Sequence, residues 1–174
     1  EIRDFDTAEI AIRASLTGHL VFSTLHTNDS AGAITRLLDM GIEPFLLASS
    51  IEAIIAQRLV RVLCKECKKP LVVNKSFLEH IHFPIEKLEH HKLFQPGSCE
   101  KCHQTGFHGR TGIFEGLCVT DTIRPMIIAR ASSNVIKQQG IKEGMRTLRD
   151  DGWVKVLSGV TTIEEVLRVS EEEE

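Results

Sequence analysis

The sequence contains no tyrosine, one tryptophan and eight phenylalanines among its 174 residues. Aromatic rings that could stack on the bases of single-stranded nucleic acid are therefore scarce. Positive charge is not in excess either, because the formal net charge is −3. A protein that binds phosphate backbones over much of its surface needs a surplus of basic side chains. We therefore expect no nucleic acid among its partners.

Long apolar runs are also missing. A membrane-spanning helix needs roughly 20 apolar residues, and the longest candidate, residues 44–56, is interrupted by Ser49, Ser50 and Glu52. The chain opens with charged residues and not with a basic and then apolar leader. We therefore expect a cytoplasmic location, where cysteine pairs bind metal more often than they form disulfides. The missing initiator methionine indicates a piece of a longer protein.

A phosphate-binding loop is absent from the sequence. None of the twelve glycines is followed by lysine, so the motif G-x-x-x-x-G-K-[ST] does not occur. Without other information, the residues do not establish nucleotide hydrolysis.

The hydrophobic pattern predicts an α/β protein. Residues 19–25 form a nearly continuous apolar run, typical of a strand buried on both faces in a parallel sheet. One helix is expected at 7–17 after a cap at Asp4 or Asp6, and another between Asn28 and Gly41. Further strand character follows at 59–63 and 110–119, and further helices at 122–130, 133–142, 147–157 and 162–169.

The change of composition along the chain divides it into four parts. We predict a core at 1–63, an inserted arm at 64–109, a return strand with a C-terminal helical region at 110–170, and an acidic tail at 171–174. The arm is rich in charged and histidine residues and has little apolar content of its own.

Two Cys-x-x-Cys pairs, Cys64/Cys67 and Cys99/Cys102, lie 31 residues apart, near the two ends of the arm. A tight Cys-x-x-Cys turn directs both thiolates at one ion, and tetrahedral zinc binds four such ligands. We therefore predict one structural Zn²⁺ held by these four cysteines. Nearby lysines can offset the formal charge of about −2 on such a site; they are Lys65, Lys68, Lys69 and Lys101.

Other interpretations of the cysteines remain open. Two disulfides would require export, Cys99 to His103 formally matches a c-type haem attachment sequence, and a redox-active pair is a third alternative. His103 could also replace one cysteine as a ligand. Cys118, alone in an apolar strand, is predicted to be a buried small hydrophobic residue.

Polar residues gather at the ends of the predicted strand 19–25. In an open parallel sheet, ligands bind at the carboxyl ends of the strands, where His26 lies; His19 lies at the opposite end. The simpler interpretation is that His19 is a satisfied histidine at a strand start, that His26 is a loop residue and that Glu1 is only a chain terminus.

Several blocks of the sequence together cover nearly the whole chain: Glu1-Ile-Arg-Asp4, Thr17 to Asn28, Arg36 to Gly41, Gln57 to Arg61, the four cysteines, Thr105 to Glu115, Gly144 to Leu148, and Gly159 to Arg168. In these blocks the chain resembles one family, the type II secretion and type IV pilus assembly ATPases.

The resemblance implies a partial RecA-like (P-loop NTPase) core from a hexameric motor. Such a motor uses ATP and Mg²⁺ and acts on an inner-membrane platform protein, so it would lie in the cytoplasm at the membrane through its partners. Glu1 would lie near the Mg²⁺ and the attacking water, and Arg3 would either stabilise phosphate charge or form a structural salt bridge. His26, and as second choice His19, would contact the terminal phosphate.

The resemblance also limits the expected activity. Retraction ATPases of the family generally lack the four-cysteine arm, which favours assembly or secretion. Because the phosphate loop is absent here, we expect the isolated chain to hydrolyse no ATP. Arg58 and Arg61 are expected to be structural or interfacial. The alternative function is a protein-docking module, held together by zinc and without chemistry of its own.

Overall fold

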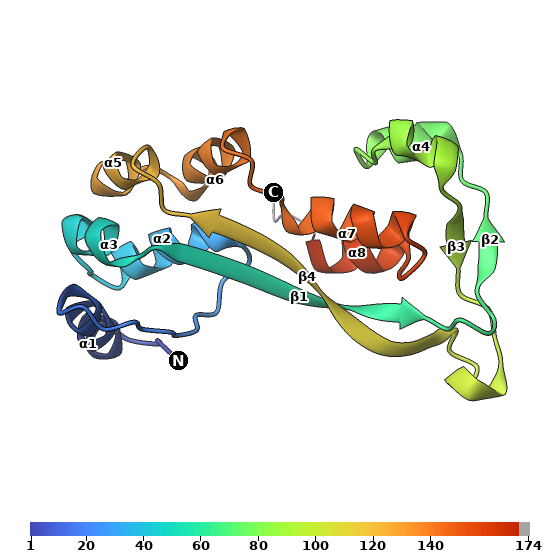
Figure 1. Cartoon of the computed structure of the whole chain (residues 1–174), viewed down its shortest axis with the longest axis horizontal. Helices are drawn as coiled ribbons and strands as arrows, with labels where there is room; N and C mark the ends of the chain where they lie inside the picture. Colours follow the sequence, from blue (N-terminus) through green and yellow to red (C-terminus); the bar gives the residue numbers. More distant parts are fainter. Residues whose placement is uncertain (171–174) are drawn as a thin grey trace. The chain divides into compact units, whose positions relative to one another are not determined.

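The computed structural model describes residues 1–170, apart from the side chains of residues 89 and 90 (Figure 1). The predicted acidic tail at 171–174 lies outside the described residues. The elements, in chain order, are α1 (Phe5–Leu16), α2 (Ser30–Asp39), α3 (Pro44–Ser50), β1 (Ala53–Leu63), β2 (Lys69–Leu71), α4 (Lys75–His80), the 3₁₀ helix η1 (Ile85–His90), β3 (Leu93–Gln95), the 3₁₀ helix η2 (Glu100–Cys102), β4 (Phe107–Cys118), α5 (Ile123–Ile128), α6 (Ser133–Lys142), α7 (Leu148–Leu157) and α8 (Ile163–Ser170).

The strands form two small sheets, which confirms an α/β protein. Strands β1 and β4 pair with each other, and β2 pairs with β3 in antiparallel register, with Pro70 opposite Phe94. The chain divides into two compact units. The first unit combines residues 1–56 and 115–147, and the second combines residues 57–114 with the chain from Leu148 onward. Among residues 1–170, no helix has both the length and the apolar character needed to cross a bilayer.

Four helices of the first unit lie within about two residues of their predicted ranges: α1, α2, α5 and α6. Asp4 caps α1 by accepting a hydrogen bond from the amide of Thr7, and Asp29 caps α2 through the amide of Gly32. Gly18 and Gly41 follow the two helices with φ of +91° and +99°, a conformation that favours glycine. The apolar faces of these helices meet residues of β4, α5 and α6 in one core, which includes Ala8, Ile12, Ile34, Leu37, Leu117, Ile123 and Ile136.

The predicted buried strand at 19–25 is wrong. These residues belong to no helix or strand, and the side chains of Leu20 and Phe22 are 84% and 87% exposed. Ile2 donates a backbone hydrogen bond of 2.9 Å to the carbonyl of Thr24. A strand becomes buried on both faces only where neighbouring strands and covering helices exist. The part of the chain that the structure describes supplies no strand beside this run.

The second unit has a core of its own. Phe83 of the predicted arm packs against Trp153 of α7, with ring centroids 5.1 Å apart. Leu78, Ile81 and Leu93 join them, together with apolar residues of α7 and α8. The few apolar residues of the arm are therefore sufficient because the C-terminal helices supply the rest of the core.

Cys118 is exposed, not buried as predicted. It ends β4, where Ile113, Glu115 and Leu117 point inward. Alternation along a strand places Cys118 on the opposite face, so its apolar neighbours in sequence gave a misleading indication.

Candidate functional site

The four predicted metal ligands come together in the second unit. The sulfur atoms of Cys64, Cys67, Cys99 and Cys102 all lie within 4.8 Å of one another. The Sγ atoms of Cys64 and Cys99 are 3.8 Å apart, as are those of Cys67 and Cys102, and those of Cys99 and Cys102 are 3.6 Å apart. A disulfide needs about 2.05 Å between sulfurs. Four sulfurs at about 2.3 Å from a tetrahedral zinc lie about 3.8 Å apart, so the spacing fits a metal and not disulfides.

Burial and the close approach of the sulfurs oppose the joint ionisation of the four thiols. Burial and hydrogen bonds to the other thiols raise the pKa of Cys67 to about 12. Burial also opposes ionisation of Cys102, but bonds from Cys99 and from the amide of Gly106 outweigh it and lower its pKa to about 6. Crowded thiols therefore do not all ionise unless a positive ion is present. Four thiolates complete a tetrahedral shell and leave no position for a reactive water.

Two glycines that the sequence reasoning missed allow the cysteine turns to approach each other. A Cβ at Gly97 would lie 1.9 Å from the carbonyl oxygen of Cys67. Gly106 has a φ of +76°, and a Cβ there would lie 2.6 Å from the Gly97 oxygen. The amide of Gly106 donates to the sulfur of Cys102 at 3.2 Å. In the sequence these glycines stand out only by lying close to Cys99 and Cys102. Their contacts become visible only in the structure.

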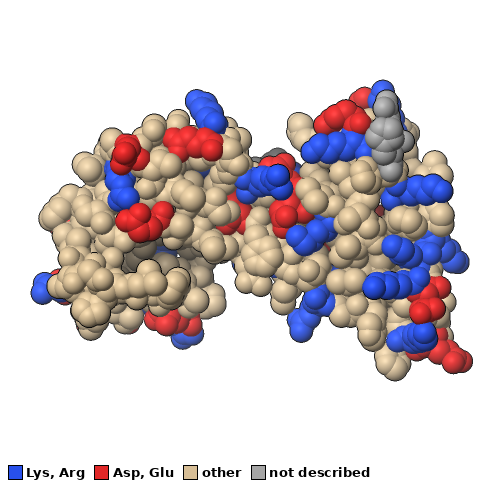
Figure 2. Space-filling model, viewed as in Figure 1, with Lys and Arg blue, Asp and Glu red and all other residues tan. Residues whose placement is uncertain are grey.

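The second unit carries several lysines close in sequence to the four cysteines. The blue side chains in Figure 2 gather over the part of the surface that carries β2 and β3. Lys68 donates to the carbonyl of Gly159 at 2.8 Å and lies 4.3 Å from the ring centre of Phe94. Lys101 pairs with Glu66 at 2.8 Å. Two of the four lysines predicted to offset the charge of the metal site, Lys68 and Lys101, therefore also contact other groups.

The second candidate site is in the first unit, around Glu1. The Nε2 atom of His26 lies 2.8 Å from Glu1 Oε1. Arg3 donates to both carboxylate oxygens, at 2.7 and 2.9 Å. The Arg3 guanidinium holds the pKa of Glu1 below its usual value, and the nearby His26 acts in the same direction. The carboxylate is therefore ionised and held between two nitrogen groups.

A pocket of about 220 Å³ lies beside this cluster. Its lining combines apolar side chains with arginine and histidine: Ile2, Arg3, Leu25, His26, Arg36 and Met40. Two guanidinium groups and an imidazole suit an anionic ligand such as a phosphate. Arg36 was missed as a site residue, although it is part of a family-like block.

His19 is not in this cluster. Its Nδ1 lies 3.0 Å from the hydroxyl of Thr17 at the end of α1. The structure therefore brings Glu1, Arg3 and His26 together and places the second-choice histidine elsewhere in the same unit.

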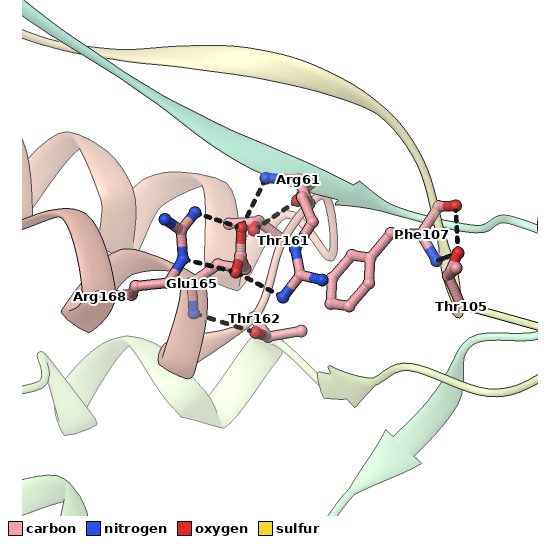
Figure 3. Close-up of polar contacts among 7 residues, drawn as sticks. All are labelled: Arg61, Thr105, Phe107, Thr161, Thr162, Glu165 and Arg168. Carbon is pink, nitrogen blue, oxygen red and sulfur yellow. Dashed lines mark hydrogen bonds and ion pairs between the residues drawn. The ribbon is translucent and has the colours of Figure 1, made fainter.

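Arg61 takes part in a buried ion network of the second unit (Figure 3). The carboxylate of Glu165 on α8 is 2% exposed and accepts hydrogen bonds from Arg61 and Arg168. The Arg61 guanidinium lies 4.1 Å from the ring centre of Phe107. Arg61 thus has structural contacts, in agreement with its expected role.

A sequence model of the family described as type II/IV secretion system protein matches residues 1–168. The chain belongs to this family.

Curated relatives of this secretion-family chain are similar over almost its whole length. Type II secretion system protein E of Dickeya dadantii is 51% identical over 174 residues, which is 99% of this chain and 34% of the relative. The type IV pilus assembly ATPase PilB of Pseudomonas aeruginosa is 46% identical over 172 residues, 99% of this chain and 30% of the relative. The secretion-family chain thus spans about a third of the length of these relatives.

Solved structures share the fold of this secretion-family chain. The pilus retraction motor PilT with bound ADP superposes with a TM-score of 0.64 at 23% identity, covering 99% of this chain and 38% of that chain. The Legionella pneumophila ATPase DotB gives a TM-score of 0.62 at 18% identity, and the match covers 97% of this chain and 36% of DotB. At these identities the likeness concerns the fold alone.

Proposed function

We propose that this chain is part of an ATPase motor that powers type II secretion or type IV pilus assembly. Relatives with close to half of their matched residues identical are named as secretion protein E and as a pilus assembly ATPase. The observation that carries the proposal is the ionised carboxylate of Glu1, held by Arg3 and His26 beside a pocket that a further basic side chain, Arg36, also lines.

The residues of this cluster suit phosphoryl transfer. Glu1 supplies a fixed carboxylate for binding Mg²⁺ or for orienting a water molecule. His26 and Arg3 supply positive or donor groups for the terminal phosphate, and such preorganised groups stabilise charge in the transition state. His19 remains the second choice, since its contact with Thr17 leaves it outside the cluster.

The proposal includes the architecture of the longer protein. A RecA-like core would be completed by segments outside this chain, which would also supply the phosphate loop for ATP. We propose a hexamer in the cytoplasm, held at the inner membrane through a platform protein. These features rest on the resemblance to the family.

The four-cysteine cluster is proposed to hold a structural Zn²⁺. The sulfur donor set and the spacings of 3.6 to 3.8 Å support this metal. When bound, the ion supplies a rigid link between the two ends of the arm. Its closed coordination shell also favours the second candidate function, in which the arm docks a partner protein and performs no chemistry.

The function is tested on the longer protein that contains this chain. His26→Ala should lower kcat for ATP about 100-fold or more, the usual effect of losing one preorganised donor. His80→Ala, an exposed histidine of α4 in the second unit, is the matched control and should leave kcat unchanged. An unchanged rate in His26→Ala would refute the catalytic proposal and favour the docking module.

The 174-residue chain alone should hydrolyse no ATP, because it has no phosphate loop. Turnover by the isolated chain that His26→Ala abolishes would contradict that expectation. The sequence that precedes Glu1 provides a direct check, since it should contain G-x-x-x-x-G-K-[ST].

A further inference from the structure

The first unit contains a buried carboxylate outside the cluster around Glu1. The side chain of Glu115, near the end of β4, is 1% exposed. Its Oε1 atom accepts hydrogen bonds from the backbone amide of Ser30 at 2.9 Å and from the Ser30 hydroxyl at 2.5 Å. These two residues are 85 positions apart in the chain. A buried carboxylate is stable only when hydrogen-bonded or paired, so this contact defines the local structure.

The contact lies at the first residue of α2. Ser30 begins the helix, and its amide is one of the N-terminal donors that the helix itself does not satisfy. Asp29, the cap, accepts the amide of Gly32 at 2.8 Å and pairs with Lys137 at 3.2 Å. Two carboxylates thus fix the start of α2, where the helix dipole favours negative charge.

His26 precedes this helix start by four residues. Between them, the Thr27 hydroxyl donates to the carbonyl of Asp29 at 3.0 Å, which closes a tight local turn. On the other side of His26, residues 19–25 are in no helix or strand and are largely exposed. His26 is therefore held from both sides: on its N-terminal side Thr24 accepts the amide of Ile2 and Leu25 packs against the core, and on its C-terminal side the attachment of α2 fixes the turn.

We propose that Glu115 is a positioning residue for His26. By fixing the amide and hydroxyl of Ser30, it fixes the turn 26–29 and so places the His26 ring against Glu1. This inference rests on the proposed function, because the position of His26 matters to catalysis only if the longer protein hydrolyses ATP. Glu115 contacts both the amide and the hydroxyl of Ser30, and it is through Ser30 that it acts on the turn.

The first experiment follows the His26 ring in the 174-residue chain. Nuclear Overhauser effects between the His26 ring and the Glu1 side chain, and the amide order of residues 26–29, are measured by NMR. Glu115→Gln should weaken the first and lower the second, since it keeps an acceptor oxygen for Ser30 but removes the charge that strengthens both hydrogen bonds. The matched control is Glu165→Gln, which neutralises an equally buried carboxylate in the second unit and should change neither measurement.

The second experiment measures ATP hydrolysis by the longer protein. Glu115→Gln should lower kcat about 10- to 100-fold, the cost of a small misplacement of a catalytic group, with less change in KM. In a His26→Ala background the same substitution should cause no further loss. If Glu115 had a purely structural role, Glu115→Gln would lower kcat by the same factor in the wild-type and His26→Ala backgrounds.

Ser30→Ala keeps the proposal testable if Glu115→Gln does not fold, which circular dichroism will show. It removes only the hydroxyl bond and should shift the same measurements by a smaller amount in the same direction. Folded variants that keep the His26–Glu1 contact, or losses that add to those of His26→Ala, would overturn the proposal. If the longer protein has no ATPase activity, the proposed function fails, while the NMR result still decides whether Glu115 positions His26.

Discussion

Arg61 on β1 donates a hydrogen bond of 2.7 Å from its side chain to Glu165 on α8, 104 residues later in the chain. The backbone amide of Arg61 donates to the other carboxylate oxygen at 2.9 Å. Arg168 donates to both oxygens from one turn along α8, at 3.0 and 2.9 Å. This single carboxylate therefore attaches the last helix to β1 within the second unit.

Replacing Glu165 by alanine should destabilise the second unit by about 2–3 kcal/mol. The substitution removes the acceptor for the Arg61 amide and for the side chains of Arg61 and Arg168. The matched control is Glu164→Ala on the same helix, whose side chain is exposed. Urea unfolding followed by tryptophan fluorescence of Trp153 measures the difference. Equal midpoints for the two variants would contradict a role for Glu165 in stability.

The same network predicts a loss of stability in acid. Burial opposes ionisation of Glu165, but the bonds from Arg168 and Arg61 outweigh it and hold its pKa at about 2, below the ordinary 4.5. A carboxyl whose pKa is lowered by folding stabilises the fold above its unfolded pKa, and this stability is lost as the pH falls toward the folded value.

The free energy of unfolding should therefore decrease between about pH 4.5 and pH 2, by on the order of 3 kcal/mol from this group. Glu165→Gln should remove this part of the pH dependence. If the free energy of unfolding of the variant falls with pH as much as that of the wild type, other carboxyls cause the decrease.

Metal analysis of the purified chain should give about one zinc per chain. Removing the ion with a chelator should expose the amides of residues 64–106 to hydrogen exchange, because the cluster links the two ends of that segment. Cys99→Ser should have the same effect, and Cys118→Ser is the control, since Cys118 is exposed and outside the cluster. A metal-free chain with full protection of these amides would rule out a structural ion.

Gly97→Ala should weaken both metal binding and the stability of the second unit. The new methyl group would overlap the carbonyl of Cys67, a backbone atom that can move only if the first cysteine turn moves. Gly116→Ala is the control, because no atom lies within 4 Å of a Cβ at that position. Zinc affinity measured by competition with a chelator should fall for the first variant and remain unchanged for the second.

Much of this protein follows from local sequence. Periodicity and capping residues such as Asp4 and Asp29 place the helices, because these signals act within a few residues. The spacing of the cysteine pairs predicts a shared centre for Cys64 and Cys99, because each pair is a local turn with a fixed ligand chemistry. Both predictions need no knowledge of the tertiary fold.

Other features depended on contacts between distant residues. The run 19–25 has the composition of a buried strand, yet a strand needs a neighbouring strand to pair with. Residues 1–170 supply none beside this run, and the single backbone hydrogen bond from Ile2 to Thr24 does not replace one. The two carboxylates at Glu115 and Glu165 resemble surface residues in the sequence. They are buried because Ser30 and Arg61, 85 and 104 positions away, supply their donors, and only folding brings such donors within hydrogen-bonding distance.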